Sequence, residues 1–252
     1  MRIIKTLFVL LLAIPSFVSA QDLNILLKEA DNLEKQQKET EAIDKYKQIL
    51  IDNPAHLKSL VKMTELNVMQ GNKQTEKSAK RLYYETALSF AKRAYMTDSN
   101  QADPNYAMAM ASGKMTEVES ENKKIVAYVK DIKIYADKAL AINPNHAKSN
   151  YTLGKWHYEM VVLSGVKKAA IKLMYGGLPE ASLESAISYM EKCKSLEPYF
   201  AANYLDLAKA YKEDHKPAPA IEVLTRLVKL PTRTSEDPAI KAEGAKLLES
   251  LQ

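Results

Sequence analysis

Cysteine and glycine are both scarce in this chain of 252 residues. Its single cysteine, Cys193, has no partner within the chain, so no intrachain disulfide can stabilise the fold. Only seven residues are glycine, whereas Ala, Leu, Lys and Glu are abundant, and this balance favours helix. Charged residues make up 27% and apolar residues 46% of the sequence, which is typical of a folded globular protein and excludes a disordered chain.

Sequence motifs of catalysis and metal binding are also missing. The chain contains no H-E-x-x-H, no G-x-S-x-G and no paired cysteines. Gly113-Lys114 does not make a phosphate-binding loop, because Met108 occupies the position of the loop's first glycine and neither Ser nor Thr follows the lysine. The four histidines are scattered along the chain. We therefore predict no enzyme, no metal site and no cofactor.

The N-terminal segment is typical of a secretory signal peptide. Arg2 and Lys5 precede a short apolar run, and small residues end the segment at Ala20, where we expect cleavage. The run is too short to span a membrane, which needs about 20 apolar residues; an uncleaved anchor is the alternative. Without residues 1–20 the chain has 34 basic and 31 acidic residues, a net charge of +3, too small to indicate nucleic acid binding. We expect secretion across the inner membrane into the periplasm, with no transmembrane segment after cleavage.

Three segments repeat one helical pattern. They are EAIDKYKQILIDNP (41–54), DIKIYADKALAINP (131–144) and SAISYMEKCKSLEP (185–198), and each has apolar or small residues twelve, eight and five positions before its proline. Those steps trace one stripe along a helix, which the proline then ends. Small residues such as Ala30 and Ala208 lie twelve positions before the matching alanines Ala42 and Ala220. The pattern resembles the tetratricopeptide repeat, two antiparallel helices in 34 residues.

The predicted fold is therefore all-α, a tetratricopeptide-like solenoid of about five helix pairs in one domain, residues 21–252. The expected units are 22–56, 57–104, 105–146, 147–200 and 201–234, followed by a C-terminal helix at 236–251. In the fourth unit the repeat opens at Leu153-Gly154, but its alanine, Ala186, comes about twenty residues late. Insertions in solenoids often lie on the binding face.

The insertion divides into three parts. We expect the first helix of the unit to continue to about Gly165, then a short basic amphipathic segment, then a turn at Gly176-Gly177, with Ser182 as the cap of the next helix. The residues expected to make contacts from the insertion are Trp156, Lys167, Lys168, Lys172, Gly176 and Gly177. Trp156 and Tyr158 either pack the insertion onto the repeat or line a groove, the lysines form a solvated face or a membrane-contact strip, and Cys193 belongs to the core.

The same region resembles the regulator of microtubule dynamics family. The matching runs are Leu153–Glu159, Leu163-Ser164, Lys167–Ala170, Gly177–Ser182, Ser185–Tyr189 and Glu197–Phe200, and the similarity extends over about residues 140–250. The resemblance implies a helical repeat domain without catalysis. In animals that family is linked to microtubules and to contact sites between the endoplasmic reticulum and mitochondria, and one member's repeat domain is linked to phospholipid binding. A secretory signal of bacterial type does not suit a microtubule partner.

The ligand-facing positions of tetratricopeptide repeats predict a groove. In the last two units they are Lys148, Tyr151, Lys155, Tyr158, Ala202, Leu205, Lys209 and Lys212, and in the first unit they are Asn24, Leu27, Asp31 and Glu34. This set makes the C-terminal half of the groove basic and aromatic, which favours an acidic protein or peptide partner. The leading function is a scaffold that holds a peptide or protein segment in the groove. The alternative is a carrier of lipid or another apolar ligand.

Overall fold

The computed structural model describes residues 20–252, which form twelve α-helices and no strand. The predicted signal peptide lies almost wholly outside the described residues and stays a prediction. The helices are α1 (Ala20–Lys35), α2 (Glu39–Asp52), α3 (Leu57–Asn72), α4 (Lys77–Thr97), α5 (Ala102–Val118), α6 (Asn122–Ile142), α7 (Ala147–Val162), α8 (Gly165–Tyr175), α9 (Leu183–Leu196), α10 (Ala201–Glu213), α11 (Pro217–Lys229) and α12 (Asp237–Glu249).

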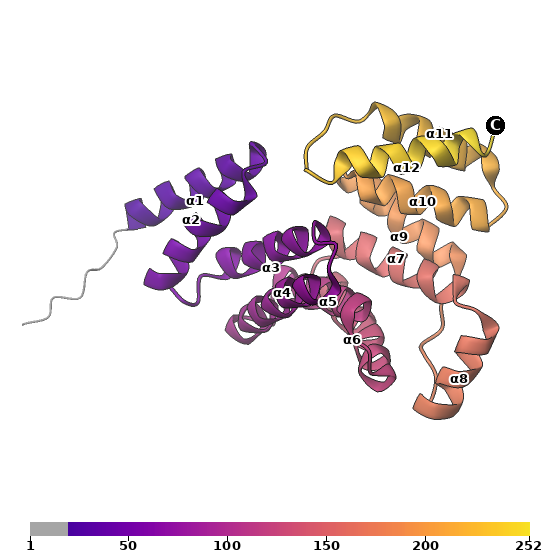
Figure 1. Ribbon diagram of the computed structural model, residues 1–252, viewed down its shortest axis with the longest axis horizontal. Coiled ribbons are helices and arrows are strands. Elements are labelled where there is room, and N and C mark those ends of the chain that lie inside the picture. The colour runs from indigo at the N-terminus through magenta and orange to yellow at the C-terminus, as the bar shows by residue number, and fades with distance from the viewer. Residues whose placement is uncertain (1–19) are drawn as a thin grey trace, which may run out of the picture.

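Ten of these helices form five pairs. The partners are α1 with α2, α3 with α4, α5 with α6, α7 with α9, and α10 with α11, while α12 packs against α10 and α11 (Figure 1). Helix α8 stands apart from the pairs: its backbone lies close to α6 alone among the other helices of residues 20–252, and the Lys168 side chain reaches the end of α7. The all-α, tetratricopeptide-like solenoid of about five pairs is therefore confirmed.

The first helices of the pairs form the inner layer of the solenoid. Among the residues that the structure describes, α3 packs on α5, α5 on α7, α7 on α10, and α10 on α12. The second helices of successive pairs lie farther apart and meet through long side chains, as where Lys138 of α6 donates to the Tyr95 hydroxyl of α4 at 3.2 Å. The layer whose helices lie closer together is on the concave side of a curved stack. Side chains that project from these first helices, away from their partners, therefore face the groove.

Small residues allow the paired helices to approach closely. Ala30, Ala42, Ala136, Ala186 and Ala208 are all completely buried, as the repeat pattern requires. Gly154 of α7 shows the limit of this approach, because a Cβ atom there would lie 2.9 Å from the Ala186 carbonyl oxygen on α9. The stripe read from the sequence is thus the contact line between the two layers.

Two of the inner helices begin with the same cap. The Nδ1 atom of His56 accepts a hydrogen bond from the Ser59 amide at 3.3 Å, and His146 Nδ1 accepts one from the Ser149 amide at 3.1 Å. Each cap satisfies an amide that the first turn of a helix otherwise leaves unpaired. A proline follows four of the five second helices, α2, α6, α9 and α11. Pro104, however, lies in the first turn of α5, so the third pair begins before residue 105, where the sequence placed its start.

The insertion differs from expectation at one point. Helix α7 ends at Val162 instead of continuing to Gly165, and Ser164 accepts a hydrogen bond from the Lys167 amide to start α8. A serine cap gives the chain a new helix start, so Gly165 opens α8. Gly176 then ends α8 with a φ of 75°, a left-handed conformation that suits glycine. Ser182 caps α9 as predicted.

The two ends of the solenoid touch each other. The loop between α11 and α12 reaches the first two pairs, where the Ser235 hydroxyl donates to Glu39 at 2.7 Å and the Asn72 amide group donates to Glu236 at 2.6 Å (Figure 1). Lys73 forms an ion pair with the same Glu39 carboxylate. The two contacts join residues 196 and 164 positions apart and limit how far the superhelix can open.

Candidate functional site

Two groups of ion pairs lie along the inner face, one joining α1, α3 and α7 and the other joining α7, α10 and α12. Together they involve five helices, and we call them the inner-face ion network. Its members are Asp31, Glu34, Lys58, Lys62, Glu65, Lys148, Lys155, Glu159, Asp206, Lys209 and Glu243. Six of them are acidic and five are basic, so the two charge signs nearly balance.

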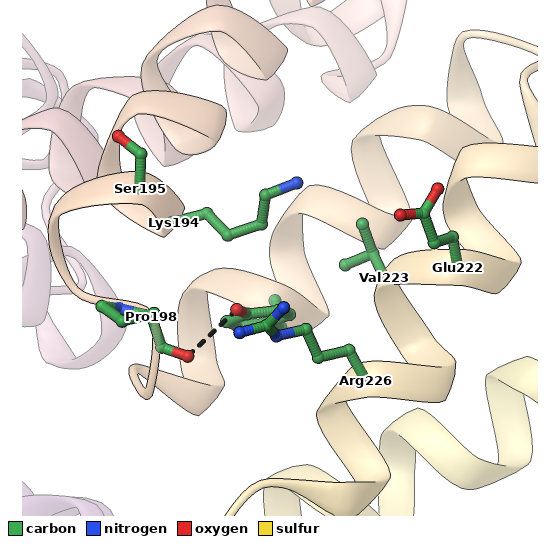
Figure 2. A pocket seen from close by; sticks show the side chains of 7 residues that line it. Lys194, Ser195, Pro198, Glu222, Val223 and Arg226 are labelled. Atoms are coloured by element: carbon green, nitrogen blue, oxygen red, sulfur yellow. Dashed lines mark hydrogen bonds between the residues drawn. The ribbon is translucent and has the colours of Figure 1, made fainter.

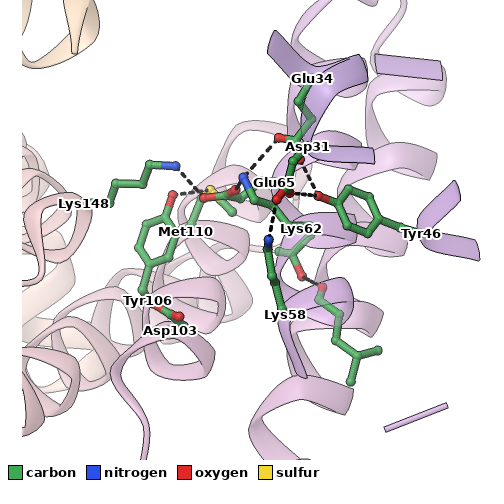
Figure 3. Close-up of polar contacts among 12 residues, drawn as sticks. Asp31, Glu34, Tyr46, Lys58, Lys62, Glu65, Asp103, Tyr106, Met110 and Lys148 are labelled. Carbon is green, nitrogen blue, oxygen red and sulfur yellow. Dashed lines mark hydrogen bonds and ion pairs between the residues drawn. The ribbon is translucent and has the colours of Figure 1, made fainter. Parts of the chain in front are cut away.

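The N-terminal part of the network joins α1 to α3 (Figure 3). Lys58 lies 2.7 Å from Asp31, and Lys62 lies 3.0 Å from Glu34. The hydroxyl of Tyr46, on α2, approaches the same two carboxylates at 3.0 and 2.6 Å. Burial opposes ionisation of Asp31, but Lys58 and the Tyr46 hydroxyl outweigh it and lower the pKa of that carboxyl. The aspartate is therefore charged at neutral pH.

Glu65 forms the centre of the network. Its carboxylate lies 2.6 Å from Lys148 of α7 and 3.0 Å from Lys62 of its own helix, and its side chain is 13% exposed. Burial alone would raise its pKa, but the two ammonium groups prevail and lower the pKa of Glu65 to about 2. Tyr106 lies between the two helices, and burial together with this carboxylate keeps the tyrosine pKa well above its usual value. The phenol is thus a neutral hydrogen-bonding group.

The C-terminal part of the network converges on Asp206 of α10. The Tyr151 hydroxyl donates to Asp206 Oδ2 at 2.8 Å, and Lys155 Nζ lies 2.9 Å from the same oxygen. Burial disfavours the ammonium form of Lys155, but Tyr151 and Asp206 raise its pKa above the usual value. Lys209 continues the chain to Glu243 of α12 at 2.8 Å.

The structure revises the sequence-based picture of a basic groove. Lys148, Tyr151, Lys155 and Lys209 do meet along the inner face, but each already has a carboxylate partner within the chain. The sequence pattern overlooked Glu65 and Asp206, because neither lies at the transferred ligand-facing positions. Their only sequence signal is a carboxylate on an inner helix, one or two turns from a lysine.

The other predicted groove residues lie in three different settings. Leu205 is buried in the C-terminal core, packed with Leu207 and Leu224, so it cannot contact a ligand and that assignment was wrong. Tyr158 and Ala202 are half-buried, and Tyr158 packs against the same core. Lys212 is exposed, one turn beyond Lys209. In the first unit, Asn24 is exposed and Leu27 packs against the N-terminal core, whereas Asp31 and Glu34 belong to the network.

Trp156 contributes to packing and not to the groove. The indole is 2% exposed, and its Nε1 donates to the Val129 carbonyl oxygen of α6 at 2.8 Å. Lys133 lies over the ring at 5.6 Å from its centroid. His157 stacks on Tyr189 and accepts a hydrogen bond from the Ser182 amide at 3.4 Å, so it anchors the end of the insertion. Of the two roles considered for Trp156, packing onto the repeat and lining a groove, packing is therefore the one that describes it.

The lysines and glycines of the insertion lie at the surface. Lys167, Lys168 and Lys172 are exposed on α8, and Gly176 is exposed at its end, with Gly177 half-buried. A pocket of about 370 Å³ lies between α8, Met160 and the loop 176–181. Lys168 and Lys172 line this pocket together with Ile171, so its wall is of mixed character.

A second pocket, of about 310 Å³, lies between α9, α10 and α11 (Figure 2). Lys194, Glu222 and Arg226 line it, and the Tyr204 hydroxyl donates to the Pro198 carbonyl oxygen at 3.0 Å along its edge. Both pockets have charged walls, which does not favour an apolar ligand. Within residues 20–252, no three His, Cys, Asp or Glu side chains come together as a metal site requires.

Cys193 is fully buried, and burial raises the pKa of its thiol to about 12. It is therefore a small core residue, as the repeat pattern indicated. No helix in the described part of the chain is both long enough and apolar enough to cross a membrane.

Comparison with known proteins agrees with this architecture. Regulator of microtubule dynamics protein 1 of Bos taurus is 30% identical over 184 residues, which are 72% of this chain and 57% of the relative. Regulator of microtubule dynamics protein 3 of the same species is 28% identical over 169 residues, or 67% of this chain and 36% of the relative. The chain thus spans little more than half the length of the first of these relatives.

A solved structure shares the fold. The crystal structure of a thermophilic tetratricopeptide repeat protein of Thermus thermophilus superposes with a TM-score of 0.63 at 13% identity, and the match covers 90% of this chain and 99% of that one. The sequence profile described as "Regulator of microtubule dynamics protein 1-3" matches residues 26–252, which is most of the chain. The protein belongs to the regulator of microtubule dynamics protein 1-3 family.

Proposed function

We propose that this protein is a non-catalytic scaffold that holds a peptide or protein segment against its inner face. The observation that carries the proposal is the inner-face ion network, which places charged groups of α1, α3, α7, α10 and α12 along the inner face. A path of this kind suits an extended or helical segment that contacts several repeats at once. The tetratricopeptide-like fold supports the same function class.

The ion pairs are accessible enough to exchange partners. The side chain of Lys155 is 40% exposed and that of Lys148 is 33% exposed, although both touch carboxylates that are nearly buried. An exposed pair such as Lys58–Asp31 contributes little to stability, about 0–1 kcal/mol, so a ligand charge can replace one partner there at small cost. The network therefore combines a defined geometry with groups that remain free to bind.

The near balance of acidic and basic groups favours a segment that carries both charge signs. A purely acidic segment has to compete with Glu65 and Asp206 for the lysines, and these carboxylates are already in place. We therefore replace the acidic ligand expected from the sequence with a segment of mixed charge. Secretion into the periplasm, which residues 1–20 indicate, is part of the same proposal.

Site-specific photocrosslinking in the native host tests the groove. A benzophenone side chain replaces Lys58 on α3 or Lys212 on α10, both on the inner face and both exposed enough to tolerate it. Matched controls replace Leu82 and Met96, two exposed apolar residues of the outer helix α4. We expect the same partner from both inner positions and no such product from the controls.

Two results would count against the scaffold. The first is crosslinking of one partner with equal yield from the inner and outer positions, and the second is the absence of any product from both inner positions. Because salt screens exposed ion pairs, capture of the partner, measured as the yield of crosslinked product, should also fall when the crosslinking is repeated in a lysate at about 0.5 M salt. Capture that does not change with salt contradicts the role given to the network.

A further inference from the structure

Helix α8 presents an apolar face to solvent. Val166 is 82% exposed, Leu173 is 89% exposed and Met174 is 64% exposed. No residue of α8 is buried within the described part of the chain. Ala169 and Ala170 are also exposed. At 100° per residue, Val166, both alanines and Leu173 lie on one side of the helix. In Figure 1, α8 extends away from the helix pairs.

The attachments of α8 fix this face outward. Ile171 and Tyr175 are half-buried and lie on the side of the helix opposite Val166. Lys130 of α6 donates to the Tyr175 carbonyl oxygen at 3.1 Å, and Lys168 donates to the Val161 carbonyl oxygen of α7 at 2.9 Å. Caps at both ends, described above, define the helix. The apolar side of α8 therefore faces solvent, although the burial of apolar surface during folding would favour the opposite orientation.

The charges beside the apolar face all have one sign. Lys167 and Lys172 lie on either side of it around the helix, and α8 contains no acidic residue. The nearest carboxylates along the chain are Glu159, before the helix, and Glu180, in the loop after it. Long lysine side chains beside an apolar strip can reach the headgroups while the strip enters the acyl boundary.

We propose that α8 docks the protein on an anionic lipid surface. Val166 and Leu173 enter the boundary between headgroups and acyl chains, and Lys167 and Lys172 contact the phosphates. The charge complementarity selects this occupant over a neutral membrane, and the exposed apolar side chains select it over simple solvation. The contact lies on the insertion and does not depend on the groove. It would hold the scaffold beside a membrane and requires no membrane-spanning helix among residues 20–252.

Vesicle sedimentation tests the apolar contact. The protein is used as its host processes it, so the wild type and all variants share one N-terminus. We expect it to sediment with vesicles of phosphatidylcholine and phosphatidylglycerol and to bind pure phosphatidylcholine much less. The double substitution Val166→Ser with Leu173→Ser should weaken partition by about tenfold or more. The control Ile51→Ser with Met96→Ser removes equally exposed apolar groups from α2 and α4 and should leave partition unchanged.

A second pair of variants tests the charges. Lys167→Gln with Lys172→Gln should remove the preference for phosphatidylglycerol, whereas Lys77→Gln with Lys123→Gln, at exposed sites elsewhere, should keep it. Emission of the buried Trp156 shows that each variant is folded. Equal binding to both kinds of vesicle, or an equal loss in the apolar control, overturns the proposal. So does a dimer in sedimentation velocity that the α8 serine variant turns into a monomer, because a second copy would then cover this face.

Discussion

Two glycines in the middle of inner helices should respond to alanine in opposite directions. A Cβ atom at Gly154 of α7 would lie 2.8 Å from Met190 Cγ and 2.9 Å from the Ala186 carbonyl oxygen on α9. At Gly113 of α5 the nearest atom in the same test is Ile132 Cδ1, at the ordinary contact distance of 3.7 Å. Alanine removes backbone freedom from the unfolded chain at both positions, so only the contacts differ.

The magnitudes follow from these contacts. Gly113→Ala should raise the free energy of unfolding by about 0.5–1 kcal/mol, the usual difference between the two residues in a helix. Gly154→Ala gains the same amount but forces α7 and α9 apart, and such overpacking costs about 1–3 kcal/mol. Because a backbone oxygen cannot rotate away as a side chain can, we expect the upper end of that cost, about 3 kcal/mol, and a net loss of about 2 kcal/mol.

Urea unfolding measures both variants. Emission of Trp156 reports on the fourth helix pair directly, since the indole is buried on α7 two residues from Gly154. We expect the midpoint to rise for Gly113→Ala and to fall for Gly154→Ala, with an unchanged slope in both. A Gly154→Ala protein that unfolds at or above the wild-type urea concentration refutes the close approach of α7 and α9.

Three further predictions concern charge, packing and capping. Glu65→Gln should lower the free energy of unfolding by about 2–3 kcal/mol at pH 7, because two lysines lose their shared carboxylate, whereas Asp44→Asn in an exposed pair should change it by less than about 0.5 kcal/mol. The pKa of Glu65 is lowered from 4.5 to about 2, so its contribution to stability is complete above pH 4.5 and disappears as the pH falls toward 2. Between these pH values the free energy of unfolding should therefore change less with pH in Glu65→Gln than in the wild type. An identical pH profile contradicts the lowered pKa of Glu65. Trp156→Phe loses the hydrogen bond to the Val129 carbonyl oxygen and part of a buried ring, so the free energy of unfolding from thermal denaturation should fall by about 2 kcal/mol. An unfolding temperature equal to that of the wild type within error means that the indole does not pack as described. Ser182→Ala should cost about 1 kcal/mol, with Ser182→Thr restoring most of it, and equal stability of the two variants argues against a capping role.

The repeat architecture could be predicted because packing of paired helices leaves a strict local pattern. The buried alanines at 30, 42, 136, 186 and 208 and the prolines after the second helices are visible in the sequence, and each has a direct physical cause. The histidine caps were not predicted, although the signal was present: NPAHLKS at 53–59 and NPNHAKS at 143–149 repeat the same cap. Pro104 misled the assignment of one boundary because proline is as favourable in the first turn of a helix as after its end.

The groove was predicted less well because its charges pair across distant segments. Lys148 and Glu65 are 83 residues apart, and Lys155 and Asp206 are 51 apart. Transferred ligand-facing positions identify the lysines but carry no information about which carboxylate lies opposite. Leu205 failed for a related reason, since a rotation of α10 by a fraction of a turn decides whether that position faces the groove or the core.

By itself, the sequence determined the helices, their pairing and the place of the insertion, because these depend on contacts between neighbours whose spacing repeats along the chain. Only the tertiary structure decided which lysines are already neutralised, that Trp156 is a core residue, that the two ends of the solenoid touch, and that α8 stands clear of the body. The physical reason is that a helix stripe is set by 3.6-residue periodicity, whereas the partner of a charge and the cover of a surface depend on how the whole stack curves.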